Sequence, residues 1–370
     1  MRSGKIDDMK QNALGEMKAR AIAWRYGNPS RGIKLIAVAG NKGKTTTALL
    51  LNELLRESGA QVAVFTNSAC QFNGEPVSGS YDNSAEAMLG QLQAVKKKGA
   101  YYVIVEVTEA LLATNVLPAL AIEMSIVTNE SASARALLEH PASSCVIPTG
   151  FDIDGLRVAP HQLISFGTDT ASEAHITSII ERRKGTEVNL VIDHQTKIAV
   201  ATYLVGQANA LNVAAAVSAA YVLAIGTEYF EEGVARLERV PGNYEYLLLH
   251  DDAAYEAVAD AAFMPLSVEL VVTSAKKLAR RRLIAVVDSS VDADCYPLLS
   301  HTADRVIAVG EGPEMPGIER APALQEAADI ATRAAKKQDL VLLLGQEVTA
   351  IQPHGEPYAQ TVVGSKHTDE

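Results

Sequence analysis

The feature that constrains this chain most is the loop Gly40-Asn41-Lys42-Gly43-Lys44-Thr45, which follows a short apolar segment and precedes a Leu-rich one. Residues 34–38 have the composition of a buried strand, and residues 45–57 have the pattern of an amphipathic helix. Glycines between a strand and a helix let backbone amides turn toward phosphate oxygens at the positive end of the helix. We expect Lys44 to reach the outer phosphates of ATP and the Thr45 hydroxyl to coordinate Mg²⁺. The alternative is an ordinary glycine-rich turn.

Strands and helices alternate along the following 170 or so residues, a pattern that predicts βαβ units and a mostly parallel sheet. The expected strands lie at residues 61–65, 101–107, 122–128 and 145–148. Between residues 175 and 204 the pattern changes to short strands with turns, which indicates an appended antiparallel meander. An Ala-rich helix follows over residues 209–223. The fold class is therefore α/β, with a central P-loop NTPase-like sheet.

The segment Val240-Pro241-Gly242-Asn243 consists of turn residues and predicts a domain boundary. Alternation then resumes, with a helix expected from about residue 254, which indicates a smaller, Rossmann-like α/β domain. We divide the chain into an amino-terminal helix and linker (1–32), a central ATP-binding domain (33–239), a carboxy-terminal α/β domain (240–364) and a disordered tail (365–370).

Charge and cysteine content restrict the partners and the location of the chain. The 33 Lys and Arg against 44 Asp and Glu give a net charge of −11, which argues against a nucleic-acid partner. No apolar run reaches the roughly 18 residues that cross a bilayer, and the polar amino terminus is unlike a signal peptide. Cys70, Cys145 and Cys295 are widely spaced single cysteines, as in proteins of a reducing compartment. The sequence predicts a cytoplasmic protein without a membrane partner.

The segment Asn41-Lys42-Gly43-Lys44-Thr45-Thr46-Thr47 resembles the ATP loop of the Mur ligases. The approach to it, Tyr26-Gly27-Asn28-Pro29-Ser30 followed by Lys34-Leu35-Ile36, resembles the MurE branch, which adds an amino acid to UDP-linked muramyl peptides. The resemblance continues to about Pro353. The amino-terminal domain that holds the UDP group in MurE enzymes is expected to be missing. A muramyl peptide would then be held elsewhere, be supplied through a partner subunit, or not be used.

The resemblance implies which residues form the site. Glu106, at the end of an expected strand, stands where the family has a Glu that binds Mg²⁺; the alternative is a solvated strand-end carboxylate. The pattern Gly206-x-x-Asn209-x-x-Asn212 is similar to the family segment that contacts adenine, and helix capping by asparagine remains the alternative. Thr128-Asn129 matches a Thr-Asn pair of the family. The implied nucleotide-binding residues are Gly40, Asn41, Lys42, Gly43, Lys44, Thr45, Thr46, Asn209 and Asn212.

Several positions depart from the family pattern. Ala110 stands where a histidine is expected, and Ser131-Ala132-Ser133-Ala134 replaces an Asp-His pair near the metals. No lysine occurs between Lys98 and Lys184, so the carbamylated lysine that supports a second Mg²⁺ in MurE-type enzymes has no counterpart. The carboxy-terminal domain departs from the pattern at Asp252-Ala253-Ala254-Tyr255, at Asp288-Ser289-Ser290-Val291-Asp292 and at Gly345-Gln346-Glu347.

The leading hypothesis is an ATP-dependent Mur-type amide ligase that acts through an acyl phosphate in cell-wall (peptidoglycan) precursor synthesis. Lys44 and Glu106 are its expected catalytic residues, with Thr45 and Glu106 as Mg²⁺ ligands. Its expected substrates are ATP, a small carboxylate such as a muramyl peptide, and an amine. The alternative is a catalytically degenerate, ATP-binding relative with a partner or regulatory role. A third hypothesis, an unrelated P-loop ATPase, is disfavoured by the second α/β domain.

Overall fold

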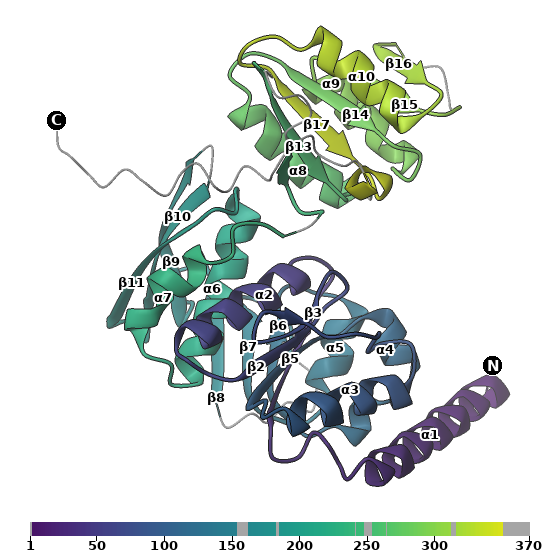
Figure 1. The fold of residues 1–370 in the computed structure, drawn as a ribbon, viewed down its shortest axis with the longest axis vertical. Coiled ribbons are helices and arrows are strands. Elements are labelled where there is room, and N and C mark those ends of the chain that lie inside the picture. Colours follow the sequence, from purple (N-terminus) through teal and green to yellow (C-terminus); the bar gives the residue numbers. More distant parts are fainter. Residues whose placement is uncertain are drawn as a thin grey trace. The chain divides into compact units, whose positions relative to one another are not determined.

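The chain folds into two compact units, Met1–Leu237 and Glu238–Glu370 (Figure 1). The structure is a computed structural model, and it describes residues 2–153, 162–182, 185–240, 242–247, 254–263, 265–311 and 316–350. Each unit has a sheet and helices of its own.

The first unit is built on an eleven-stranded sheet in the order β11-β10-β9-β8-β7-β6-β1-β5-β2-β3-β4. Strands β2 and β5 to β9 join β1 in a continuous parallel arrangement. The strands β10 and β11 at one end, and β3 and β4 at the other, pair in the antiparallel sense. The expected mostly parallel sheet with appended antiparallel strands is confirmed. The bounds are β1 Lys34–Ala39, β2 Val62–Phe65, β3 Cys70–Phe72, β4 Glu75–Pro76, β5 Tyr102–Glu106, β6 Ile122–Val127, β7 Ala142–Pro148, β8 Gln162–Gly167, β9 Ala174–Arg182, β10 Gly185–Ile192 and β11 Thr196–Thr202.

Helices cover both faces of the central part of this sheet. Apolar side chains of α1, α3, α4 and α5 form one core with residues of the central strands. On the opposite face α2 packs against α6 and α7. This leaves the amino end of α2 at the edge where the parallel strands end. The bounds are α1 Arg2–Arg25, α2 Lys44–Glu57, α3 Ala85–Lys97, α4 Glu109–Ala113, α5 Ala132–Leu138, α6 Gln207–Val222 and α7 Phe230–Ala235, with 3-10 turns at Leu117–Ala119 and Thr227–Tyr229.

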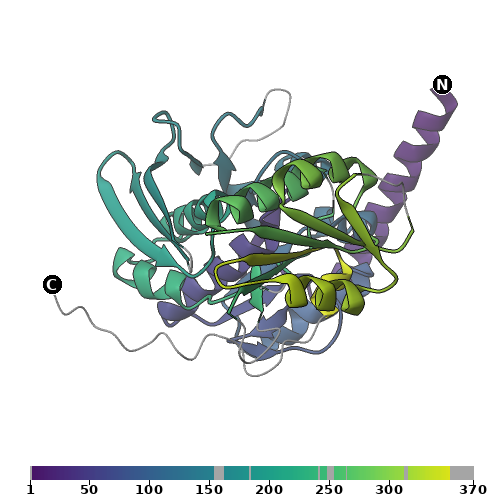
Figure 2. The same cartoon turned by 90° about the horizontal axis from the view of Figure 1, so that it is seen from above.

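The second unit has a six-stranded sheet in the order β12-β13-β17-β14-β15-β16, in which only β12 pairs in the antiparallel sense. Helices α8 and α9 pack on one face and α10 on the other, so that the strands lie between helices (Figure 2). The second α/β sheet agrees with the expected fold class. The bounds are β12 Glu245–Leu247, β13 Glu256–Asp260, α8 Pro265–Leu278, β14 Leu283–Val287, α9 Tyr296–Thr302, β15 Arg305–Val309, β16 Ile318–Ala321, α10 Leu324–Ala334 and β17 Leu340–Leu344, with 3-10 turns at Ala293–Cys295 and Glu347–Ala350.

The expected start of a helix at about residue 254 is wrong, because residues 256–260 form strand β13 and the helix α8 begins only at Pro265. Ala257, Val258 and Ala259 are buried, and they pair with β12 on one side and β17 on the other. Small residues in the middle of a sheet leave room for the helices that cover it, and this tertiary context outweighs the helix propensity of alanine. The expected disordered tail, 365–370, lies outside the described residues.

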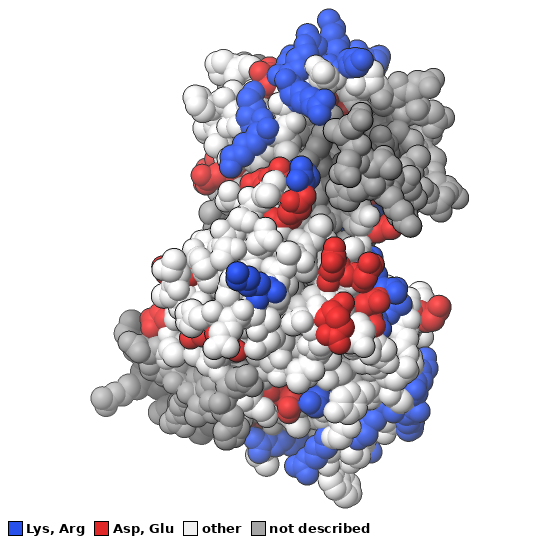
Figure 3. All heavy atoms as spheres, turned by 90° about the vertical axis from the view of Figure 1, so that its left-hand side faces the viewer, with Lys and Arg blue, Asp and Glu red and all other residues white. Residues whose placement is uncertain are grey.

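None of the helices in the described part of the chain combines the length and the apolar character that crossing a bilayer requires. On the face drawn in Figure 3, lysine and arginine side chains gather in one group at the top of the view and in another at its lower right, and acidic side chains gather near the middle.

Candidate nucleotide-binding site

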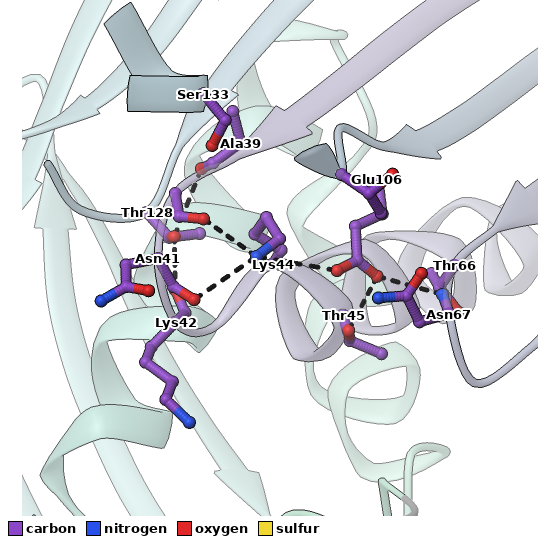
Figure 4. A network of polar contacts seen from close by, with 12 residues as sticks. Ala39, Asn41, Lys42, Lys44, Thr45, Thr66, Asn67, Glu106, Thr128 and Ser133 are labelled. Atoms are coloured by element: carbon purple, nitrogen blue, oxygen red, sulfur yellow. Dashed lines mark hydrogen bonds and ion pairs between the residues drawn. The ribbon is translucent and has the colours of Figure 1, made fainter. Parts of the chain in front are cut away.

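The candidate site lies where four neighbouring strands of the first sheet, β6, β1, β5 and β2, end side by side. Because these strands are parallel, their carboxyl ends share one edge of the sheet. The loop after β1 carries residues 40–43, and β5 ends at Glu106. The segments after β6 and β2 bring Thr128 and Asn67 to the same edge (Figure 4), and Asn129 follows Thr128 and binds the loop.

Helix α2 begins directly after this loop. Its N-cap residue, Gly43, adopts the left-handed conformation (φ 82°, ψ −8°) and has no side chain with which to cap the helix. The first amides of a helix have no partner within the helix, and together with the helix dipole they attract anions. The amino end of α2 is therefore suited to phosphate groups, as the sequence predicts.

Lys44, Thr45 and Glu106 come together at this point, as Figure 4 shows. The Thr45 hydroxyl donates a hydrogen bond of 2.8 Å to Glu106 Oε2, and Lys44 Nζ lies 3.8 Å from Glu106 Oε1. Lys44 Nζ also donates to the Gly40 carbonyl oxygen at 2.9 Å. Glu106 is only 2% exposed, so it is not the solvated strand-end carboxylate of the alternative interpretation. A buried carboxylate requires such charged and hydrogen-bonding partners.

Glu106 has two further partners that the sequence analysis missed. The Asn67 amide donates to Glu106 Oε2 at 3.3 Å, and the Tyr81 hydroxyl donates to the Glu106 carbonyl oxygen at 2.9 Å. Burial, together with the nearby Glu106 charge, raises the pKa of Tyr81 well above its ordinary value, so this hydroxyl stays protonated as a donor. Neither residue belongs to a motif of the loop, and only the fold brings them to it.

Gly40 is glycine for a reason that the loop sequence does not reveal. A Cβ atom at this position would lie 2.1 Å from Thr128 Oγ1, and its φ of +144° is unfavourable for other residues. Thr128 Oγ1 donates to the Lys42 carbonyl oxygen at 2.5 Å. Asn129 binds the same loop three times: its Oδ1 accepts from the Asn41 and Lys42 amides, and its Nδ2 donates to the Lys42 carbonyl oxygen. We call Thr128 and Asn129 the loop clamp.

Gly43 is equally restricted, by Asn212 on helix α6. A Cβ atom at Gly43 would lie 2.2 Å from Asn212 Oδ1, so a side chain on residue 43 and the carboxamide of Asn212 exclude one another. Asn212 Nδ2 in turn donates to Asn209 Oδ1 at 3.2 Å, and Asn209 Nδ2 donates to the Val205 carbonyl oxygen. The N-cap of α6 is Gly206, so neither asparagine occupies the capping position of the alternative interpretation. Both asparagines are 8% exposed.

The remaining loop residues play different parts. The backbone amides of Asn41 and Lys42 donate hydrogen bonds to Asn129 Oδ1. The Lys42 side chain extends away from Lys44 and Glu106 (Figure 4). Thr46 is completely buried in the first turn of α2. The structure therefore gathers all of the predicted residues around one loop, but only Lys44 and Thr45 direct side chains at Glu106.

The positions that depart from the family pattern carry no histidine-like donor here. Ala110 is exposed on the short helix α4. Ser131 Oγ accepts a hydrogen bond from the Ala134 amide and so caps helix α5, while Ala134 is completely buried. This segment serves helix formation, with Ser133 Oγ hydrogen-bonded to Ser131 Oγ.

In the second unit, the two departing loops bind one another. Asp288 is completely buried at the end of β14, and Ser290 donates to its Oδ1 while the Glu347 amide donates to its Oδ2. The Ser290 hydroxyl accepts from the Gln346 amide. A Cβ atom at Gly345 would lie 1.9 Å from Asp288 Oδ1. The Asp288 carboxylate is thus occupied in joining the ends of β14 and β17. Of the other departing segment, Asp252 and Ala253 lie outside the described residues.

The donor set at the loop fits ATP with Mg²⁺. Thr45 Oγ1 and Glu106 Oε2 are two hard oxygen atoms in direct contact beside the amino end of α2. Mg²⁺ prefers oxygen ligands and is usually held by one or two carboxylates together with water and substrate phosphates. Within the described residues no group of three His, Cys, Asp or Glu side chains forms a metal site, so a metal here would depend on the phosphates for further ligands.

Comparison with known proteins finds ligases and synthases that are similar to this chain. No family model matches the chain. The chain is 26% identical, over an alignment of 383 positions that covers 94% of it and 70% of the relative, to the UDP-N-acetylmuramoyl-L-alanyl-D-glutamate–2,6-diaminopimelate ligase of Corynebacterium efficiens.

Two solved structures show the same fold. A UDP-N-acetylmuramoyl-L-alanyl-D-glutamate–2,6-diaminopimelate ligase matches with a TM-score of 0.64 and 20% identity, covering 90% of this chain and 76% of the other. The folylpolyglutamate synthase of Mycobacterium tuberculosis, complexed with ADP and AMPPCP, matches with a TM-score of 0.72 and 15% identity, covering 92% and 96%. The chain is therefore similar in sequence, over most of its length, to ligases of the MurE type, and it shares its fold with solved ligases and a folylpolyglutamate synthase.

Proposed function

We propose that this chain is an ATP-dependent amide ligase of the Mur type, which joins a carboxylic acid to an amine in cell-wall precursor synthesis. The observation that carries the proposal is the contact of Lys44 and Thr45 with the buried Glu106 at the amino end of α2. The relatives support the reaction class, since they are named as ligases of UDP-N-acetylmuramoyl-L-alanyl-D-glutamate and 2,6-diaminopimelate and as a folylpolyglutamate synthase. A muramyl peptide is therefore the first candidate for the acid.

In this proposal the residues of the loop bind and orient the nucleotide. The amides at the amino end of α2 bind phosphate oxygens, and Lys44 exchanges its bond to the Gly40 carbonyl oxygen for one to the outer phosphates. Thr45 and Glu106 hold Mg²⁺, which neutralises phosphate charge when bound. Asn209 and Asn212, beside Gly43, hold the nucleotide from the side of α6. In the reaction, the carboxylate of the acid takes the terminal phosphoryl group of ATP and ADP leaves. The amine then attacks the carbonyl carbon of the acyl phosphate, and the amide forms as inorganic phosphate and a proton leave.

Turnover is expected to be slow. Ala110 and Ala134 offer no side-chain donor, and the sequence has no lysine between Lys98 and Lys184 that could support a second Mg²⁺. Removing a single group that stabilises charge in a transition state costs about 10²–10³ in rate. Binding depends on fewer groups than turnover, so ATP affinity is expected to persist where catalysis is weak.

The test compares the dissociation constant of ATP with the rate of ADP release across a panel of muramyl-peptide acids and amino acids. Tight, Mg²⁺-dependent ATP binding with amide formation well below about one turnover per second supports the proposal. ATP binding without any amide product favours the degenerate, regulatory relative. Turnover of about one per second or faster contradicts the expectation of a weakened site, and absence of ATP binding removes the nucleotide function altogether.

A further inference from the structure

In the described part of helix α1, two small side chains are buried and three large apolar ones are exposed, while Ile22 packs partly buried against the core. Ala19 and Ala23 are 1% and 2% exposed and belong to the core of the first unit, whereas Leu14, Met17 and Trp24 are 53%, 68% and 78% exposed. A helix that only covers its own domain is expected to do the reverse, because burying a large apolar side chain stabilises by about 1.5–3 kcal/mol. In both Figure 1 and Figure 2 the helix extends away from the rest of the first unit.

The exposed apolar residues have the spacing of a helix–helix seam. Leu14, Met17, Ala21 and Trp24, which we call the docking stripe, follow one another at intervals of three, four and three residues. At about 100° per residue they cover an arc of roughly 80°. A stripe of this width is typical of coiled-coil contacts, whereas helices that lie on a membrane have a broader apolar face. The small Ala21 allows a partner helix to approach closely.

Charges on both sides of the docking stripe restrict the partner. Lys18 and Arg25 flank it on one side and Arg20 on the other, and all three are exposed. In a pair of helices, the residues beside the seam face the corresponding residues of the partner. A second copy of α1 would place these cations opposite one another, which is unfavourable. The complementary partner is a helix with carboxylates in these positions.

We infer that the docking stripe binds an amphipathic helix of another protein, whose own apolar stripe is flanked by Asp and Glu. This surface lies on α1 and shares no residue with the nucleotide site, so it does not depend on the proposed ligase activity.

The chain contains a single tryptophan, Trp24, and this residue lies in the docking stripe. Its fluorescence therefore reports directly on occupation of the stripe in the full-length protein. The probe is a synthetic helical peptide with Leu at the seam positions and Glu at the flanking positions; the matched peptide carries Lys in place of Glu. We expect the Glu peptide to produce a saturable shift of the emission toward shorter wavelength, weakened by salt, and the Lys peptide to produce none.

Two sets of variants make the test specific. The triple variant Lys18→Glu, Arg20→Glu, Arg25→Glu is expected to bind the Glu peptide about tenfold more weakly and to gain binding of the Lys peptide. Met17→Glu should abolish binding, whereas Leu270→Glu, at a 51% exposed position on α8, should leave it unchanged. All of these positions are exposed, and circular dichroism verifies that the variants fold.

Four outcomes would overturn the inference. They are equal responses to the two peptides, no response to either, a shift produced by vesicles of anionic lipid but not by the Glu peptide, and self-association in sedimentation that itself shifts the emission. The last two would assign the docking stripe to a membrane or to a second copy of the chain.

Discussion

At the scale of single residues, Lys44 is the group whose charge we expect to matter most for the proposed nucleotide binding. Its ammonium lies between the Gly40 carbonyl oxygen and the buried Glu106 carboxylate, with 18% of the side chain exposed. Lys44→Ala is expected to weaken ATP binding at least about tenfold, since a hydrogen bond to a charged group contributes about 1.5–3 kcal/mol. Calorimetric titration with ATP and Mg²⁺ measures the effect. Unchanged affinity in a folded variant would remove Lys44 from the site.

Glu106→Gln separates the role of the charge from the role of the shape. The amide keeps the size of the side chain but loses the charge that attracts a divalent cation. We therefore expect the variant to lose affinity for Mg²⁺-ATP while its affinity for ATP in EDTA changes little. The comparison requires titrations with and without metal. Equal losses in the two conditions would mean that Glu106 supports the loop without contributing to metal binding.

Asn129 is the residue whose importance is least visible in the sequence. Its side chain makes three hydrogen bonds to the backbone of Asn41 and Lys42, so it holds the first half of the loop in place. Asn129→Ala is expected to weaken ATP binding about tenfold through loss of loop order. Asn189→Ala, on the surface of β10 and hydrogen-bonded to Ser178, is the matched control. If both variants bind ATP like the parent protein, the loop clamp has no role in binding.

At the scale of secondary structure, the start of β14 and the start of β17 are joined by an ion pair. Asp339 is completely buried, and Arg282 donates to its carboxylate with both Nε and a terminal nitrogen. Burial alone would raise the pKa of Asp339, but the hydrogen bonds from Arg282 and from the Lys336 amide outweigh it and hold the pKa below its ordinary value. The carboxylate therefore stabilises the folded second unit in its ionised form.

Arg282→Ala leaves this buried carboxylate with fewer partners and is expected to destabilise the second unit by about 2–3 kcal/mol, since the Arg282 side chain is itself 33% exposed. The depressed pKa has a second consequence. The contribution of ionised Asp339 to the stability of the folded unit is complete above the unfolded-state pKa of about 3.9. It is lost as the pH falls through the lower folded-state pKa. Urea unfolding between pH 2 and 7 measures both effects, and the variant should lose part of the acid dependence.

Arg305→Ala is the control for this experiment, because Arg305 pairs on the surface with Glu319, which is 49% exposed. Such pairs contribute about 0–1 kcal/mol. Similar effects of the two substitutions would contradict the assignment of a special role to Asp339.

The sequence predicts an element well where the local pattern of residues determines its structure, and poorly where contacts with distant segments determine it. The segments around the loop were predicted to within about a residue or two, since β1, α2 and β5 have strong local patterns. Local composition predicts a helix where strand β13 lies, because its alanines form a strand only through pairing with the neighbours β12 and β17. In the site, the loop motif predicts Lys44 and Thr45, and the end of the expected strand predicts Glu106. The contacts of Asn129 with Asn41 and of Asn212 with Gly43 span 88 residues or more and depend on strand order.

At the scale of the whole molecule, the chain has two units with separate cores. Such proteins generally do not unfold in one two-state transition. We expect two transitions in scanning calorimetry. ATP with Mg²⁺ should raise the unfolding temperature of the first unit only. At a ligand concentration of 100 times the dissociation constant, the free energy of unfolding of this unit should increase by about 2.7 kcal/mol. Arg282→Ala identifies the other transition by lowering it. A single transition that responds to both would mean that the units unfold together.

The close approach of Thr128 and Asn212 to the two glycines also bears on protein engineering. The hexapeptide Gly40–Thr45 looks like a self-contained motif, yet its glycines leave space for side chains that come from the segment after strand β6 and from helix α6. Transplanted alone between a strand and a helix of another scaffold, the hexapeptide would lose the bonds that shape its backbone. The smallest transferable unit therefore includes residues 128–129 and Asn212, and a design that copies only the contiguous segment should produce a flexible turn.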